Sequence, residues 1–334
     1  MRSSARVLAL LLAVGLAACA SSSESGSARP GRGGFNGALH PAGVLAAGSI
    51  ASVEEPPRGT IAPVLARVRV REDEPYRGLG TWIDIYDHEV WQRPTRSVRS
   101  MAAHGIRTIY LQTSNYNRNQ PFVHREGVEA ILDAAKEQGL EVVAWYLPGF
   151  ADVATDLQRT ILSIRMRTKA GNAFDSFALD IESPEVRRPS VRTRRLLRLS
   201  EAIRREAGAE YPLGAIVASP HRLVRTDPYF WPGFPWRRLA DLYDVMLPMT
   251  YYTYRVAGPQ DAAWYTAQNV QIIRKETSGM NVPIHVVGGI SFEATGPETQ
   301  GFVRTVENKH VIGASYYTYP GITPDQWKAL RALR

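Results

Sequence analysis

The stretch FDSFALDIE, residues 174–182, alternates apolar and acidic side chains as a β-strand with two different faces does. Successive side chains on a strand point to opposite faces, so the large apolar residues share one face and the two carboxylates share the other. The apolar face comprises Phe177, Leu179 and Ile181, and the other face comprises Ala178, Asp180 and Glu182. Such a strand suits a barrel, with helices packed against its outer face and the carboxylates directed into the bore.

Asp180 and Glu182 lie two residues apart at the end of this predicted strand. Two carboxylates at that spacing repel each other, and the repulsion can hold a proton on one of them near neutral pH. A protonated acid beside an ionised partner is what the cleavage of a glycosidic bond requires. The alternative interpretation is that the pair only caps the helix that follows the strand.

The rest of the chain repeats the same strand-and-helix unit from Tyr76 onward. Apolar, β-branched runs lie at Gly80–Tyr86, Thr108–Thr113, Glu141–Leu147, Ser176–Glu182, Leu213–Ala218, Asp244–Thr250, Ile284–Gly289 and Gly313–Tyr317. Helix-like segments lie between and after them, at 95–104, 126–138, 153–170, 190–207, 261–276, 297–308 and 324–333. Eight such units over about 260 residues predict an α/β fold, a (β/α)8 TIM barrel over residues 76–334. A doubly wound open sheet is the alternative, but no G-x-G-x-x-G follows the first strand.

The first 75 residues have a different composition. Arg2 and Arg6 precede a short apolar run, and the sequence LAAC ending at Cys19 resembles a bacterial lipobox. We expect residues 1–18 to be a lipoprotein signal peptide, although an ordinary secretory peptide is the alternative. Residues 19–75 then form a lipidated cysteine and a flexible tether, because the segment is mostly rich in Ser, Gly, Ala and Pro. These features predict an extracytoplasmic protein, anchored to the bacterial cell membrane through lipid on Cys19.

The formal net charge is +8, which could favour anionic lipid headgroups or acidic wall polymers. The sequence contains no basic helix or RNA-binding signature, so we expect no nucleic-acid partner. The arginines from Arg187 to Arg205 are interpreted mainly as the solvated face of one long helix.

The strand ends of the predicted barrel carry many aromatic and acidic residues. Active sites of TIM barrels lie at these carboxyl ends. Aromatic rings can stack on sugar rings while polar groups bond to hydroxyls, so this composition predicts a groove that binds a polysaccharide or cell-wall glycan. The predicted substrate-binding residues are Asp84, Tyr86, Trp145, Tyr146, Tyr252, Glu293 and Tyr317.

Two of the strands carry a more specific resemblance. FDSFALDIE resembles the strand-4 signature D-x-x-D-x-D-x-E of chitinase-like family-18 glycoside hydrolases. Asp175, Asp180 and Glu182 match it, while Ala178 replaces the middle Asp. The sixth strand, MLPMTYYTY, is similar to the M-T-Y-D of that family, with Met249, Thr250 and Tyr251 matching and Tyr252 replacing the Asp.

This resemblance implies a catalytic role for three residues. Glu182 would be the general acid, Asp180 would orient it, and Tyr251 would bind the acetamido group of the substrate. The acetamido oxygen would then be the nucleophile, so no second protein nucleophile would be needed. The missing Asp side chains at Ala178 and Tyr252 leave open a non-catalytic glycan-binding or scaffolding barrel.

Two other arrangements of carboxylates remain open. The first strand, TWIDIYD, together with LDIES, is similar to family-25 lysozymes, and would bring Asp84 together with Asp180 and Glu182. A retaining pair of Glu182 and Glu293 is the third arrangement, although Ile181 occupies the place where such barrels carry Asn.

We expect neither a metal ion nor a cofactor. The seven histidines are scattered and form no H-E-x-x-H motif. The sequence HVVGGIS at the seventh strand is similar to the Gly-Gly turn of phosphate-binding barrels, but an exported protein meets few phosphorylated metabolites.

Overall fold

The computed structural model describes residues 72–254 and 258–333. The predicted signal peptide, Cys19 and nearly all of the predicted tether lie outside the described residues. Within these two ranges, no helix combines the length and the apolar character that crossing a bilayer would take.

Eight parallel strands form a single sheet in the order β6-β5-β4-β3-β2-β1-β8-β7. They are β1 (Gly78–Ile83), β2 (Thr108–Asn115), β3 (Glu141–Leu147), β4 (Ser176–Ile181), β5 (Leu213–Val217), β6 (Val245–Pro248), β7 (His285–Ile290) and β8 (Gly313–Tyr317). Parallel bridges from Met246 to Ile284 and from Met249 to Val287 bring β6 against β7 and close the sheet. The predicted (β/α)8 barrel is confirmed.

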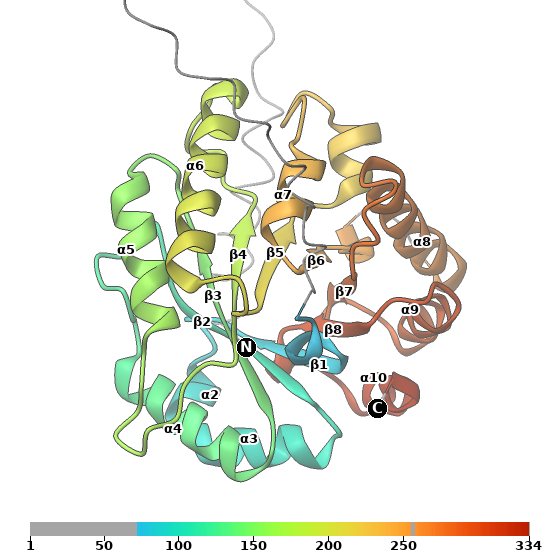
Figure 1. Ribbon diagram of the computed structural model, residues 1–334. Helices are drawn as coiled ribbons and strands as arrows, with labels where there is room; N and C mark the ends of the chain where they lie inside the picture. Colours follow the sequence, from blue (N-terminus) through green and yellow to red (C-terminus); the bar gives the residue numbers. More distant parts are fainter. Residues whose placement is uncertain (1–71, 255–257, 334) are drawn as a thin grey trace, which may run out of the picture. The chain divides into compact units, whose positions relative to one another are not determined.

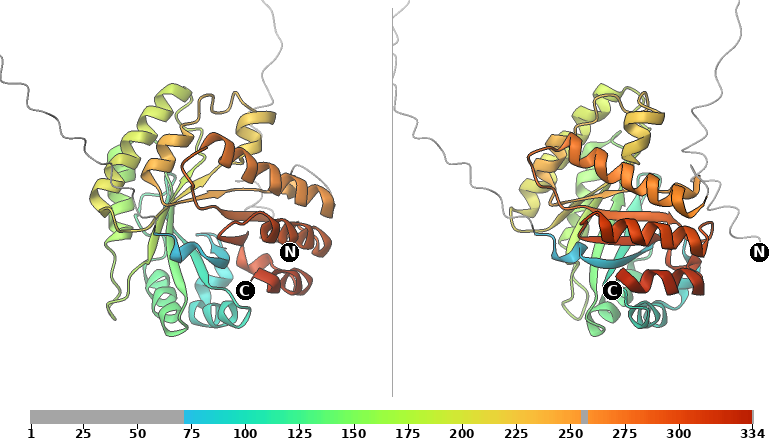
Figure 2. Two further views of the ribbon diagram at one scale, coloured as in Figure 1. Left: turned by 45° about the vertical axis from the view of Figure 1, so that its right-hand side comes forward. Right: turned by 90° about the vertical axis from the view of Figure 1, so that its right-hand side faces the viewer.

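Helices surround the strands on the outside, as Figure 1 and the two further views of Figure 2 show. They are α2 (His88–Gln92), α3 (Pro94–Ala103), α4 (Arg125–Glu137), α5 (Val153–Ile164), α6 (Pro189–Ala207), α7 (Trp236–Leu242), α8 (Pro259–Glu276), α9 (Gly296–Asn308) and α10 (Pro324–Leu330). The loop between β5 and α7 is long and contains one π-helical turn, η2 (Arg222–Thr226). A short 3-10 helix, η1 (Glu74–Tyr76), precedes the barrel.

Several helices begin at a side chain that accepts hydrogen bonds from free backbone amides. The Asp152 carboxylate accepts from the backbone N of Ala154 and of Thr155, each at 3.1 Å, where α5 begins. Thr295 and Glu298 form a capping box where α9 begins. Each such cap contributes about 1 kcal/mol to stability, which fixes where the helix starts.

Aromatic rings fill the bore of the barrel beneath its carboxyl end. The Trp82 ring stacks on Tyr110 at 4.3 Å between centroids and meets Trp145 edge-on at 5.6 Å. Gly80 makes room for this packing, because a Cβ there would lie 2.6 Å from the Tyr110 ring. At the amino end, the Tyr76 hydroxyl bonds with Ser176 of β4. This layer of rings forms a floor beneath the carboxyl end of the barrel.

Gly288 and Gly289 of the HVVGGIS sequence do not form the tight turn by which phosphate-binding barrels hold a phosphate. Both residues lie within β7 (His285–Ile290), and a Cβ on either would collide with a tyrosine ring. These glycines therefore allow Tyr316 and Tyr252 to pack closely against the strand.

Candidate active site

Asp180 lies near the carboxyl end of β4 with its side chain almost fully buried. Its side chain makes no hydrogen bond within the described part of the chain, and its Oδ1 atom is entirely buried. Burial raises the pKa of Asp180 well above its usual range, and the charge of Glu182 raises it further. This shift favours the neutral form of the Asp180 carboxyl, and in that form the carboxyl can donate a hydrogen bond to a ligand.

Glu182 follows β4 directly and is half-buried. Burial raises the pKa of the Glu182 carboxyl, while the positive charge of Arg222 opposes the rise. Because the Asp180 and Glu182 carboxyl groups interact, the two groups titrate together and not independently. The pair combines a proton donor with a partially accessible carboxyl, which is the pattern that general acid catalysis uses.

Tyr251 comes from the loop after β6 and lies close enough to Asp180 and Glu182 for their charges to affect its pKa. Burial raises the pKa of Tyr251 well above its usual range, and the charges of Glu182 and Asp180 raise it further. Its hydroxyl is therefore a permanent hydrogen-bond donor beside the pair. The structure thus brings together the three residues predicted to be catalytic.

Asp84 follows β1 and binds Tyr317 of β8, the strand that pairs with β1 in the sheet. The Tyr317 hydroxyl donates to Asp84 Oδ2 at 2.6 Å, and the backbone N of Tyr86 donates to Oδ1 at 2.6 Å. Burial raises the pKa of Asp84, while the hydrogen bond from Tyr317 opposes the rise. Since the Tyr317 ring lies 6.0 Å from the Tyr251 ring, Asp84 positions the aromatic wall next to the pair.

Tyr146 and Tyr252 were predicted to bind substrate, and the structure corrects this assignment. Tyr146 is fully buried against α5, where its hydroxyl donates to Asp156 Oδ1 at 2.7 Å. Tyr252 is also fully buried, and its hydroxyl bonds with Tyr316 outside the bore. Tyr146 follows Trp145 on β3, and alternation along that strand turns its ring outward, whereas Tyr252 lies in the short 3-10 helix η3 (Tyr252–Tyr254) after β6.

The remaining predicted residues lie at different depths. Trp145 is 5% exposed, and its indole N donates to the Tyr110 carbonyl at 3.3 Å, so it forms the floor of the site. Tyr86 is partly exposed after β1, next to the Arg118 guanidinium. Glu293 is exposed in the loop after β7. Burial of Tyr254, together with the charge of Glu293, raises the pKa of Tyr254 to about 12.

The sequence analysis missed two arginines near the pair. Arg192 belongs to the segment interpreted as a solvated helix face, yet it is 2% exposed. Arg222 lies in η2 and interacts with Glu182. Its place in the loop after β5 was the one available signal, because that loop starts at the carboxyl end of the barrel.

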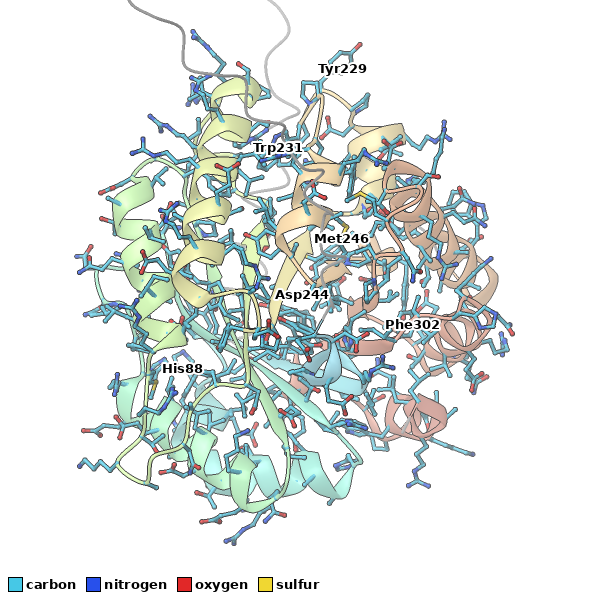
Figure 3. The ribbon with its side chains drawn as sticks, viewed as in Figure 1. His88, Tyr229, Trp231, Asp244, Met246 and Phe302 are labelled. Atoms are coloured by element: carbon cyan, nitrogen blue, oxygen red, sulfur yellow. The ribbon has the colours of Figure 1, made fainter. Side chains whose placement is uncertain are left out.

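Exposed aromatic rings lie around the carboxyl end of the barrel. The large exposed aromatic residues of the described segments are Tyr229, Tyr254, Trp264 and Phe292. Figure 3 shows Tyr229 at the outer edge of the molecule, where it is 89% exposed, and Trp231 in the interior beside α6. Such rings can stack on sugar faces, as expected of a glycan-binding rim.

No cluster of three or more His, Cys, Asp or Glu side chains suited to a metal ion occurs within residues 72–254 and 258–333.

Comparison with known proteins supports the architecture. No protein-family model matches the sequence, and no curated protein matches it significantly. Among solved structures, an endo-β-1,4-mannanase from Thermotoga petrophila superposes with a TM-score of 0.58 and 12% identity, covering 77% of this chain and 76% of that one. A family GH18 chitinase from Cycas revoluta gives a TM-score of 0.56 and 13% identity, covering 76% and 98%. The spore cortex-lytic enzyme SleL from Bacillus megaterium gives 0.52 and 9%, covering 77% and 74%. These similarities establish the barrel fold.

Proposed function

We propose that this protein is a glycoside hydrolase that cleaves a glycan containing N-acetylhexosamine. The observation that carries the proposal is the convergence of Asp180, Glu182 and Tyr251 at the carboxyl end of the barrel, with the pKa of each raised. The similar folds of a chitinase and a spore cortex-lytic enzyme support the same class of substrate.

In the proposed reaction, Glu182 donates its proton to the glycosidic oxygen as the bond to the sugar breaks. The acetamido carbonyl oxygen of the same sugar attacks the anomeric carbon and forms a cyclic intermediate. Neutral Asp180 and the Tyr251 hydroxyl hold the acetamido group in place for this attack. Ionised Glu182 then takes a proton from the water that opens the ring, which restores the acid.

The acetamido group itself provides the test of this mechanism. Oligosaccharides of N-acetylglucosamine and of glucosamine have the same length and linkage but differ in this group. We expect hydrolysis of the acetylated oligosaccharide alone, and a large loss of rate in Tyr251→Phe. Equal rates on the two oligosaccharides would contradict the mechanism.

A second candidate function is a barrel that binds glycans without cleaving them. It is favoured by Ala178, which is fully buried on the same face as Asp180, where the family-18 signature carries an Asp. Without that acid, Asp180 Oδ1 lacks a hydrogen-bond partner in the described segments. Binding of N-acetylglucosamine oligosaccharides without turnover, unchanged in Glu182→Gln, would favour this candidate.

We further propose that lipid on Cys19 anchors the chain to the outer face of a bacterial membrane, where such glycans occur. The support is the LAAC sequence after a short apolar run. Cys19→Ala should move the protein from the membrane fraction to the soluble fraction. Retention of this variant in the membrane fraction would contradict the anchor.

A further inference from the structure

Two arginines share an aromatic ring on the loop between β5 and α7. The guanidinium of Arg222 lies 4.2 Å from the centroid of the Phe230 ring, and that of Arg192 lies 4.9 Å from the same centroid. Arg192 also lies 4.0 Å from the Trp231 ring. We call Arg192, Arg222, Phe230 and Trp231 the arginine cluster.

Arg192 attaches this cluster to the catalytic strand. Its Nη1 donates to the carbonyl of Ser183, the residue after Glu182, at 3.3 Å, and its Nη2 donates to the Phe230 carbonyl. No carboxylate forms an ion pair with Arg192 in the described part of the chain. Burial and the charge of Arg222 lower the pKa of Arg192 to about 10, so Arg192 remains a cation at neutral pH. It therefore positions the loop and leaves its positive charge uncompensated.

Arg222 has a different hydrogen-bond arrangement. Its Nε and Nη2 donate to Asp227 Oδ2 at 3.2 and 3.0 Å. No acceptor for Nη1 lies within residues 72–254 and 258–333, and the side chain is 15% exposed. The guanidinium is planar and matches a carboxylate with two parallel N–H groups, so the side that Asp227 does not occupy can bind a second carboxylate.

The charges around Glu182 also favour an anionic ligand. Glu182 carries a proton when it acts as an acid, and Asp180 is neutral as well. Among residues 72–254 and 258–333, Asp227 is the one carboxylate that forms an ion pair with either Arg192 or Arg222. A carboxylate on the ligand would neutralise the excess positive charge.

We propose that Arg222 binds a carboxylate of the substrate, on a sugar next to the one held at Glu182, and that the protein therefore selects acidic glycans. This inference rests on the proposed function, since it assigns the class of glycan that the same site accepts. The carboxylate could belong to a lactyl ether on an amino sugar or to a uronic acid.

The test measures binding in Glu182→Gln, so that turnover is not needed. The ligands are a tetrasaccharide of alternating N-acetylglucosamine and N-acetylmuramic acid, a hyaluronan tetrasaccharide of glucuronic acid and N-acetylglucosamine, and the methyl ester of each. A charge-assisted hydrogen-bonded pair corresponds to a preference of about 10- to 100-fold for an acid over its ester. Titration calorimetry should show this preference for one of the two acidic glycans, which identifies the source of the carboxylate.

Two variants and a control assign the preference to Arg222. Adding Arg222→Gln should abolish it, whereas Asp227→Asn should strengthen binding of the acid because it removes a competing carboxylate. Arg225→Gln is the matched control, because Arg225 is exposed on the same π-helical turn. Thermal unfolding of each variant verifies that the barrel is intact.

The outcomes separate this inference from the proposed function. Equal affinity for acid and ester would overturn the inference while leaving the glycan site intact. Loss of affinity for both ligands by the same factor in Arg222→Gln would also overturn it, because Arg222 would then only support the loop. Binding of none of the glycans would overturn the proposed function, and the inference with it.

Discussion

Asp175 and Asp180 stand at opposite ends of β4, and their carboxylates have opposite surroundings. Asp175 Oδ2 accepts from Lys136 Nζ at 2.6 Å and from the backbone N of Val142 at 2.7 Å. Asp180 makes no hydrogen bond with any described residue and has Glu182 as its charged neighbour. One carboxylate is neutralised and joins neighbouring elements, while the other is buried without a partner.

The same contrast holds for the barrel as a whole. Asp244, at the amino end of β6 (Figure 3), accepts from Arg204 Nη2 at 2.7 Å and from the backbone N of Leu213 at 2.9 Å. The amino end of a TIM barrel serves stability and the carboxyl end serves chemistry. Asp175 and Asp244, at the amino end, each form an ion pair, whereas Asp180, at the carboxyl end, forms none with any described residue.

The largest effect on stability is expected at Asp244. This side chain is 1% exposed and Arg204 is 13% exposed, so Asp244→Ala leaves a cation buried with fewer acceptors. Breaking a buried pair costs about 3–5 kcal/mol. Urea denaturation should show this loss, with Glu210→Ala, an exposed carboxylate at the same end, as the control. A loss no larger than that of the control would remove the contrast between the two ends.

A smaller effect of opposite sign is expected at Asp180. The folded-state pKa of this carboxyl is raised, so the folded state is penalised once the pH exceeds the unfolded-state pKa, near 4. Asp180→Asn should therefore stabilise the protein by about 1–3 kcal/mol at pH 8 and have little effect at pH 4. Thermal unfolding at both pH values measures the difference.

Asp175→Asn is the matched variant, because it makes the same chemical change at the other end of β4. It removes the charge that pairs with Lys136, and we expect a lower melting temperature at pH 8. If both variants shift the melting temperature in the same direction, the two carboxylates do not differ as described.

The smallest effect is expected at Tyr317. Tyr317→Phe removes the hydrogen bond to Asp84 and should cost about 1 kcal/mol of stability. The ring remains beside Tyr251, so the loss of activity should be much smaller than that for a missing acid. Kinetic measurements on Tyr317→Phe and Tyr317→Ala would separate the hydroxyl from the ring. An equal loss of activity in both variants would place the hydroxyl in the chemistry.

The barrel and the acidic face of β4 could be predicted from the sequence, because both follow from regular alternation. The orientation of two adjacent aromatic side chains could not be predicted from the sequence. On β3, Trp145 lies at the floor of the site while the adjacent Tyr146 packs against α5. After β6, Tyr251 lies near the acidic pair while the adjacent Tyr252 is buried against Tyr316. Large rings fit the inner and the outer side of a barrel equally well, so composition does not predict which of two adjacent aromatic residues faces the bore.

The burial of Arg192 could not be predicted from the sequence either. It is one of many arginines on α6, and the loop that covers it comes from residues 230 and 231, about forty positions later. Which arginine of a helix is covered depends on the path of a distant loop. Local periodicity carries no information on that path.

The most direct test of the account is the rate at which Glu182→Gln hydrolyses an N-acetylglucosamine oligosaccharide. Loss of a general acid should lower kcat/KM by about 10²–10⁴-fold relative to the unmodified protein. Glu137→Gln, which changes an exposed carboxylate at the end of α4, is the matched control and should retain full activity. Undiminished hydrolysis by Glu182→Gln would contradict the claim that the two carboxyl groups at the end of β4 perform the chemistry.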